Sequence, residues 1–211
     1  MMKTAMVWGA GGGIGSALVK RLVEAGWTVL SVARDPASAT TETSRVVVAD
    51  VEDPDSVRQA VQRAKGLVDK VDLWVYAVGD IVSAKVAEMS LDDWQRILAV
   101  NLSGAFLATQ ESLPLLASDA HLVFLGAVSE RLRLPGLAAY ATAKAGLEAF
   151  VEVLRKEQRG RAVTIVRPKA VETSLWDKVP FSMPHGARDP DDLAVRILEA
   201  YQEGHRGFLD L

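Results

Sequence analysis

The chain has 211 residues, of which 49% are hydrophobic and 24% charged, and its formal net charge is −3 at pH 7. These proportions predict one globular domain over residues 1–211 and argue against a nucleic-acid or membrane partner. There is no cysteine, and His121, His185 and His205 lack the spacing of metal ligands, so we expect no metal site. No apolar run is long enough to span a membrane, and we therefore expect a cytoplasmic protein.

Short apolar runs alternate with longer amphipathic segments along the whole chain. Strands are predicted over residues 5–8, 28–33, 45–49, 72–78, 121–125, 162–166 and 207–211, the last at a sheet edge. Helices are predicted from the glycine-rich turn to residue 25, over 54–65, from 91 through 101 towards 116, over 138–158 and over 190–202. Asp53, Ser90 and Asp189 have the positions of N-caps, and Pro114 is expected to end or bend the third helix. This alternation predicts an α/β fold of the Rossmann type, doubly wound, with a mainly parallel sheet and helices on both faces.

The turn after the first predicted strand has the spacing G-x-x-x-G-x-G, with glycines at positions 9, 13 and 15. Glycines allow a tight turn and a close approach of the backbone to a pyrophosphate, which the following helix N-terminus attracts. A flexible loop without a ligand is the alternative. The position of the turn between the first strand and the first helix favours a dinucleotide site.

Tyr140 and Lys144 lie four residues apart in a predicted helix, which places their side chains on one face, one turn apart. A nearby cation favours the phenolate, so this spacing suits a tyrosine that acts as a general acid/base. By itself the pair is common by chance, and a surface pair is the simpler interpretation. Its combination with the glycine spacing favours a catalytic pair.

Together these motifs resemble the short-chain dehydrogenase/reductase family over nearly the whole chain. The resemblance assigns cofactor contacts to the phosphate turn, the end of the third strand, the N-N-A-G strand end, the catalytic pair and the segment beside the nicotinamide. These contacts are Gly9, Gly11, Gly13, Ile14, Gly15, Asp50, Val51, Ala77, Val78, Gly79, Tyr140, Lys144, Pro168, Val171 and Thr173.

The same resemblance implies the catalytic roles. Tyr140 would exchange a proton with the substrate oxygen, and Lys144 would hold the nicotinamide ribose and lower the pKa of Tyr140. Asn101 would hold a water molecule in a proton relay. Similarity to the family also implies a homodimer or homotetramer, for which the small-residue stripe Ala141, Ala145, Ala149 and Val153 provides a helix face.

The sequence departs from the family at the serine that donates a hydrogen bond to the substrate oxygen, because Ala127 occupies that position. Loss of such a donor typically costs about 10²–10³ in rate. Two roles are open for Ser129: a replacement that reaches in from the loop, or a residue that only caps or solvates the turn. Tyr76 and Ala77 replace the two asparagines of N-N-A-G, and the lid segment between Thr173 and Asp189 is short.

Cofactor choice is usually set at the end of the second strand. Ala33 stands where an acidic residue would bind the ribose diol of NAD, and Arg34 follows it. A guanidinium pairs well with a 2′-phosphate, so we predict NADP(H) in preference to NAD(H). Asp35 would bind the diol instead if the strand ended one residue later.

Two function classes follow. The first is an oxidoreductase that transfers a hydride between NADP(H) and a small carbonyl or alcohol substrate, with Tyr140 as the general acid/base. The second is a catalytically impaired NADP(H)-binding sensor or regulator on the same fold. Intact Tyr140, Lys144 and Asn101 favour the enzyme, whereas Ala127 and the short lid favour the sensor.

Overall fold

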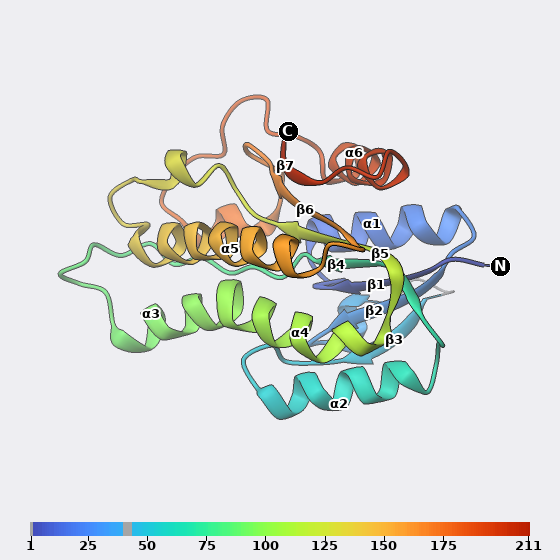
Figure 1. Ribbon diagram of the computed structural model, residues 1–211. Helices are drawn as coiled ribbons and strands as arrows, with labels where there is room; N and C mark the ends of the chain where they lie inside the picture. The colour runs from blue at the N-terminus through green and yellow to red at the C-terminus, as the bar shows by residue number, and fades with distance from the viewer. Residues whose placement is uncertain (1, 40–43) are drawn as a thin grey trace.

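The protein is built around a seven-stranded parallel sheet (Figure 1). The structure is a computed structural model that describes residues 2–39 and 44–211. The strand order is β3-β2-β1-β4-β5-β6-β7, and every strand pair is parallel. The strands are β1 (Thr4–Trp8), β2 (Thr28–Ala33), β3 (Arg45–Val48), β4 (Val71–Tyr76), β5 (Leu116–Leu125), β6 (Ala162–Arg167) and β7 (Gly207–Asp210). The winding direction reverses between β1 and β4, and this confirms the predicted doubly wound fold.

Helices cover both faces of the sheet, so each face carries its own hydrophobic core (Figure 1). On one face lie α1 (Gly13–Glu24) and α6 (Pro190–Gln202), which contact each other. The other face is covered by α2 (Pro54–Lys65), α4 (Gly104–Ser112) and α5 (Ala138–Glu157), while α3 (Leu91–Leu98) packs on α5. Because helices cover both faces, the strands are buried on both sides, and this accounts for their continuous apolar sequences.

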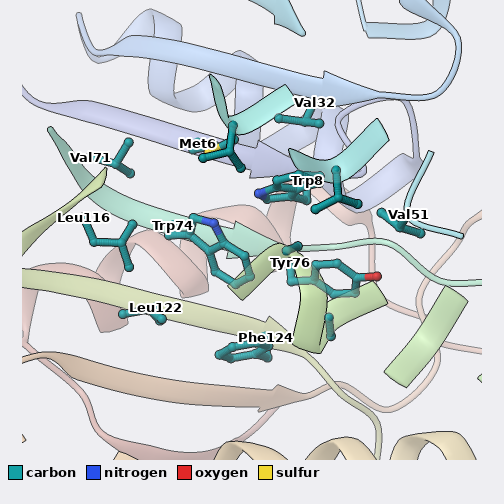
Figure 2. Close-up of a cluster of buried hydrophobic side chains, with 14 of the residues drawn as sticks. Met6, Trp8, Val32, Val51, Val71, Trp74, Tyr76, Leu116, Leu122 and Phe124 are labelled. Atoms are coloured by element: carbon teal, nitrogen blue, oxygen red, sulfur yellow. The ribbon is translucent and has the colours of Figure 1, made fainter. Parts of the chain in front are cut away.

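Aromatic side chains fill the core on the α2–α4–α5 face. Figure 2 shows Trp8, Trp74, Tyr76 and Phe124 together on adjacent strands, and all four are fully buried. The ring centroids of Trp74 and Phe124 are 5.3 Å apart. Large rings of this kind bury much apolar area, and they anchor the two central strands whose carboxyl ends form the site.

The predicted helix caps are present. The Asp53 carboxylate accepts from the backbone N–H of residue 55 at 2.9 Å, and the Asp189 carboxylate accepts from that of residue 191 at 2.7 Å. The Ser90 hydroxyl oxygen accepts from the N–H of residue 93 at 3.0 Å. Each bond satisfies an N–H group that the helix itself leaves free, and the predicted helix starts are therefore confirmed.

The helix predicted from residue 91 through Asn101 towards 116 is confirmed as one continuous run, but it is not α-helical throughout. After α3 the chain forms a π-helical segment, η2 (Ala99–Ser103), before α4, and the 3₁₀ turn η3 (Leu113–Leu115) ends the run at Pro114. The Tyr76 hydroxyl donates to the Val100 carbonyl at 2.7 Å, inside the π-helical segment. Single π-helical turns within helices are frequent at functional sites, and this one carries Asn101.

None of the helices in the described part of the chain combines the length and the apolar composition that crossing a bilayer requires.

Candidate active site

The glycine turn between β1 and α1 depends on backbone contacts that a side chain would break. Gly9 has φ +85°, and a Cβ there would lie 2.7 Å from the carbonyl carbon of Ala77. A Cβ at Gly15 would lie 2.1 Å from the Gly9 oxygen. α1 begins without a side-chain cap and without an acidic residue in its first turn. Its first N–H groups therefore suit an anion, as the sequence predicts.

A cavity of about 430 Å³ extends from this turn across the carboxyl ends of the central strands. This volume is in the range typical of small-molecule sites. Predicted residues that line it are Gly9, Gly11, Arg34, Asp50, Val51, Ala77, Val78 and Gly79. Lining residues that the sequence reasoning missed include Ser38, Glu52, Asp80, Arg96 and Lys178.

The remaining predicted cofactor residues do not line this cavity: Gly13, Ile14, Gly15, Tyr140, Lys144, Pro168, Val171 and Thr173. Thr173 nevertheless reaches the glycine turn, because its Cγ2 lies 2.9 Å from the place of a Cβ at Gly13. The segment after β6 and the glycine turn therefore meet at the start of α1, although they are 160 residues apart, counted from Gly13 to Thr173.

Arg34 and Asp35 differ in what their side chains do at the end of β2. The strand ends at Ala33, where the sequence predicts it to end. The Asp35 carboxylate accepts from the N–H of Ala37 at 2.9 Å, and so caps the 3₁₀ turn η1 (Pro36–Ala39). Both Arg34 and Asp35 line the cavity. Asp35 thus has a local structural partner that its sequence position does not reveal.

Tyr140 and Lys144 lie on α5 behind Gly79, and both are buried. The Lys144 Nζ donates to the Leu125 carbonyl at 2.9 Å and lies 5.6 Å from the centroid of the Tyr140 ring. Burial lowers the pKa of Lys144 to about 8 and raises the pKa of Tyr140 to about 12. The expected lowering of the tyrosine pKa is absent from this arrangement, because desolvation of the phenolate dominates.

Asn101 is fully buried beside the same glycine. Its Nδ2 donates to the carbonyls of Asp80 at 2.8 Å and Ile97 at 2.9 Å. Its Oδ1 accepts from no described group. A Cβ at Gly79 would lie 3.4 Å from this oxygen and 3.9 Å from the Lys144 Nζ. An unpaired buried oxygen near a buried ammonium is the kind of polar site that holds an ordered water or a ligand hydroxyl.

The loop after β5 carries Ala127, which is buried, and then the short turn η4 (Ser129–Leu132). The Ser129 hydroxyl donates to the Glu148 carboxylate at 3.1 Å. Glu148 lies two helical turns beyond Tyr140 on α5, which is about 12 Å along the axis. Ser129 can therefore serve a substrate at Tyr140 only after it leaves Glu148.

Part of the predicted lid segment packs near Tyr140. In the turn η5 (Ser174–Lys178) and just after it, Leu175 and Val179 pack on the hydrophobic cluster that contains Tyr140. The Lys178 Nζ pairs with the Asp80 carboxylate at 2.6 Å, and Arg96 pairs with the same carboxylate. The sequence held one signal for this cluster of three charged side chains: Asp80 directly follows Gly79, the last residue of the predicted N-N-A-G strand end.

Comparisons with known proteins agree with this geometry. A family model described as short chain dehydrogenase matches residues 3–181. An uncharacterized oxidoreductase of Staphylococcus aureus is 27% identical over 209 residues, which cover 94% of this chain and 90% of the relative. The 2-dehydro-3-deoxy-L-rhamnonate dehydrogenase (NAD(+)) of a Sphingomonas species is 28% identical over 191 residues, 85% of this chain and 76% of the relative.

Solved structures give the same result. A 3-ketoacyl-(acyl-carrier-protein) reductase from Brucella melitensis, complexed with NADH, superposes with a TM-score of 0.89 at 25% identity. The match covers 99% of this chain and 96% of the reductase. A short-chain dehydrogenase/reductase from Serratia marcescens superposes with a TM-score of 0.88, at the same identity and the same coverage of both chains.

Proposed function

The chain belongs to the short-chain dehydrogenase family, and from this premise we propose that it transfers a hydride between NADP(H) and a small carbonyl or alcohol substrate. Tyr140 is the general acid/base of the proposed reaction. The observation that carries the proposal is the joint placement of Tyr140, Lys144 and Asn101 behind Gly79, at the end of the cavity that begins at the glycine turn.

The residues present fit a nicotinamide dinucleotide. The close contacts at Gly9 and Gly15 leave backbone where side chains would otherwise stand, and the uncapped start of α1 suits a pyrophosphate. Asp50 and Val51 would contact the adenine. The unpaired Asn101 Oδ1 and the Lys144 ammonium would meet the nicotinamide ribose or a water beside it.

Proton transfer falls to this chain's own side chains, while the bound cofactor supplies or accepts the hydride. In the reducing direction Tyr140 donates its hydroxyl proton to the substrate oxygen. Lys144, one turn further along α5, stabilises the phenolate that this leaves. Asn101 holds the water through which the proton is replaced. Ala127 offers no hydrogen bond to the substrate oxygen, so Tyr140 acts there without the usual second donor.

Arg34 supports NADP(H) as the preferred cofactor. It lines the cavity directly after β2, and Asp35 is engaged in capping η1. The Sphingomonas relative is named for NAD(+), and the Brucella reductase is complexed with NADH. We place the difference at residues 33 and 34, where Ala33 lacks a carboxylate for a ribose diol and Arg34 offers a partner for a 2′-phosphate.

A sensor or regulatory protein is the second candidate, and two observations favour it. Ala127 removes one donor from the reaction, and lid residues pack on the cluster that contains Tyr140. Such a protein binds NADP(H) tightly and converts substrate slowly.

One pair of experiments separates the candidates. Titration with NADPH and NADH, followed by tryptophan fluorescence, tests cofactor binding, because Trp8 lies at the cavity. Turnover of a panel of aldehydes, ketones and alcohols then tests catalysis, and Ala127→Ser raises activity if the missing donor limits the rate. Failure of both dinucleotides to bind at about 1 mM, roughly −4 kcal/mol of affinity, overturns both candidates. Tight binding with no turnover by either form supports the sensor.

We propose further that two or four copies associate through α5 and α4. Ala145, Ala149 and Val153 are exposed along α5, and Phe106 of α4, which is 45% exposed, contacts Phe150 of α5. Small residues let helices approach closely. Ala149→Glu should shift the mass measured by light scattering from oligomer to monomer, and an unchanged mass would contradict this interface.

A further inference from the structure

Asp80 joins three separate segments at the end of the cavity. Its carboxylate pairs with Lys178 of the lid and with Arg96 of α3, and its own carbonyl accepts from Asn101. The Asp80 side chain is only 14% exposed, whereas that of Lys178 is 54% exposed. A largely buried carboxylate therefore pairs with a lysine that is exposed to solvent and lines the cavity.

The two cations on Asp80 are not equivalent. Arg96 also pairs with Asp93 at 3.0 Å, so it keeps a carboxylate partner without Asp80. For Lys178, Asp80 is the one carboxylate within 4 Å among residues 2–39 and 44–211. When Lys178 leaves Asp80, Arg96 consequently keeps its own carboxylate partners, and no second cation loses its partner.

The phosphate turn contains no cation of its own. Residues 9–16 include no lysine or arginine, and α1 offers only backbone N–H groups to a pyrophosphate that carries two negative charges. Lys178 lines the same cavity as Gly11 and Gly12. A carboxylate and a phosphate both give Lys178 a charge-assisted hydrogen bond, so a phosphate can compete with Asp80 for this ammonium.

Release of Lys178 would act on the reaction centre through the lid. Lys178 is the last residue of η5, and its neighbours Leu175 and Val179 pack on the cluster that contains Tyr140. Movement of this short segment would uncover Tyr140 and expose to solvent a phenol whose pKa burial raises to about 12.

We propose that the Asp80–Lys178 ion pair is a latch that holds the lid over Tyr140, and that Lys178 exchanges Asp80 for the pyrophosphate of the incoming dinucleotide. Lys178 is in this way a further cofactor-binding residue, and Asp80 is a positioning residue that acts through it. The inference rests on the proposed function, because it requires that a dinucleotide binds in the cavity.

The test measures dissociation constants for NADPH and NADH in the wild type, Asp80→Asn, Lys178→Met and the double variant. Asp80→Asn removes the competitor of the phosphate, and we expect about three- to tenfold tighter binding of both cofactors, since both carry the pyrophosphate. Lys178→Met should bind both more weakly than Asp80→Asn by at least about tenfold. In the Lys178→Met background, Asp80→Asn should change affinity by less than about twofold.

A second readout follows the lid itself. Trp176 lies in η5, where its Nε1 donates to the Val171 carbonyl at 2.8 Å. Its acrylamide quenching, taken as the difference between each protein and its Trp176→Phe form, should rise in Asp80→Asn and on addition of NADPH to the wild type. Lys156→Met is the matched control, because it removes an exposed lysine of α5 that does not line the cavity.

Three outcomes are decisive. Unchanged affinity and unchanged Trp176 quenching in Asp80→Asn overturn the latch while leaving cofactor binding intact. An equal effect of Asp80→Asn with and without Lys178 overturns the exchange, because Asp80 would then act on the cofactor directly. Absence of binding by the wild type overturns the proposed function and, with it, this inference. Lys178→Met tests the exchange from an exposed position even if Asp80→Asn fails to fold.

Discussion

Polar groups are buried at both ends of the parallel sheet, but they are used differently. At the amino ends of the strands, the Thr164 hydroxyl donates to the His205 carbonyl at 2.8 Å and lies 2.9 Å from the His121 Nε2. Arg161 donates to three backbone carbonyls nearby. At the carboxyl ends, Asn101 Oδ1 accepts from no described group, and Lys178 shares its carboxylate with Arg96.

This difference shows how the fold separates stability from function. In a parallel sheet every strand ends at the same edge, and the loops there lead into helix N-termini that attract anions. Polar groups at this edge can be left for a ligand, whereas at the opposite edge the Thr164 hydroxyl lies within hydrogen-bond distance of both His121 and His205. Substitutions at the carboxyl edge should therefore change binding and turnover, and those at the amino edge should change stability.

The largest effect is expected for Tyr140→Phe, which removes the hydroxyl and keeps the ring. Loss of a general acid/base lowers turnover by about 10²–10⁴-fold. NADPH affinity should stay within about threefold of the wild type, since the Tyr140 hydroxyl is one of many expected cofactor contacts. Steady-state oxidation of NADPH by a responsive carbonyl, together with fluorescence titration, measures both quantities.

Ser129→Ala is the matched control for loss of a hydroxyl. Because this hydroxyl is bonded to Glu148, we expect its turnover to fall by less than about tenfold. A Tyr140→Phe variant that kept more than a tenth of wild-type turnover would remove Tyr140 from the chemistry.

The amino edge should respond to pH through His121. Burial lowers the pKa of His121 to about 4, below the unfolded value of about 6.5. Between these two values the unfolded chain binds a proton that the folded protein does not, so the free energy of unfolding falls as the pH falls. The loss begins near pH 6.5 and reaches about 3 kcal/mol by pH 4.

Urea unfolding at pH 7 and pH 4.5 measures this loss, and its His121-dependent part should be absent from His121→Gln. His185→Gln, in the exposed lid, serves as the control and should lose as much stability as the wild type. Equal acid sensitivity of wild type and His121→Gln would place the effect elsewhere. NADPH affinity at pH 7 should be the same in all three proteins.

At the carboxyl edge, Arg34→Ala should separate the two nicotinamide cofactors. Loss of a charge-assisted contact to a 2′-phosphate costs about 1.5–3 kcal/mol, so the dissociation constant for NADPH should rise about 10- to 100-fold. The constant for NADH should change by less than about threefold. Asp35→Asn, which keeps an oxygen for the Ala37 N–H, is the control and should preserve the preference. An equal loss for both cofactors would argue against NADP(H).

The smallest effect is expected for a substitution of Tyr76, a fully buried residue at the end of β4. Tyr76→Phe leaves the buried Val100 carbonyl without its hydroxyl partner, which should cost about 1–2 kcal/mol in the free energy of unfolding. Tyr201→Phe is the control, because no hydroxyl hydrogen bond of Tyr201 is found within residues 2–39 and 44–211. A similar loss in both variants would mean that the Tyr76 bond is not what stabilises η2.

Local patterns account for the elements that were predicted well. Caps at Asp53, Ser90 and Asp189 act within three residues of their helices, and the end of β2 at Ala33 follows from its own apolar run. The π-helical segment after α3 was not predicted. The Tyr76 hydroxyl that bonds to the Val100 carbonyl within it comes from a strand 24 residues earlier in the chain. No short-range pattern carries such a contact.

The sequence by itself determined the family, the order of the elements and the placement of the glycine turn, Arg34, Asn101, Tyr140 and Lys144 on them. These depend on periodicity, capping and motif spacing, which act over a few residues. Only the tertiary structure decided that burial raises the pKa of Tyr140, that Ser129 bonds to Glu148 and that Lys178 meets Asp80. Each of these depends on desolvation or on a contact between distant segments, and both exist only once the sheet and its covering helices have assembled.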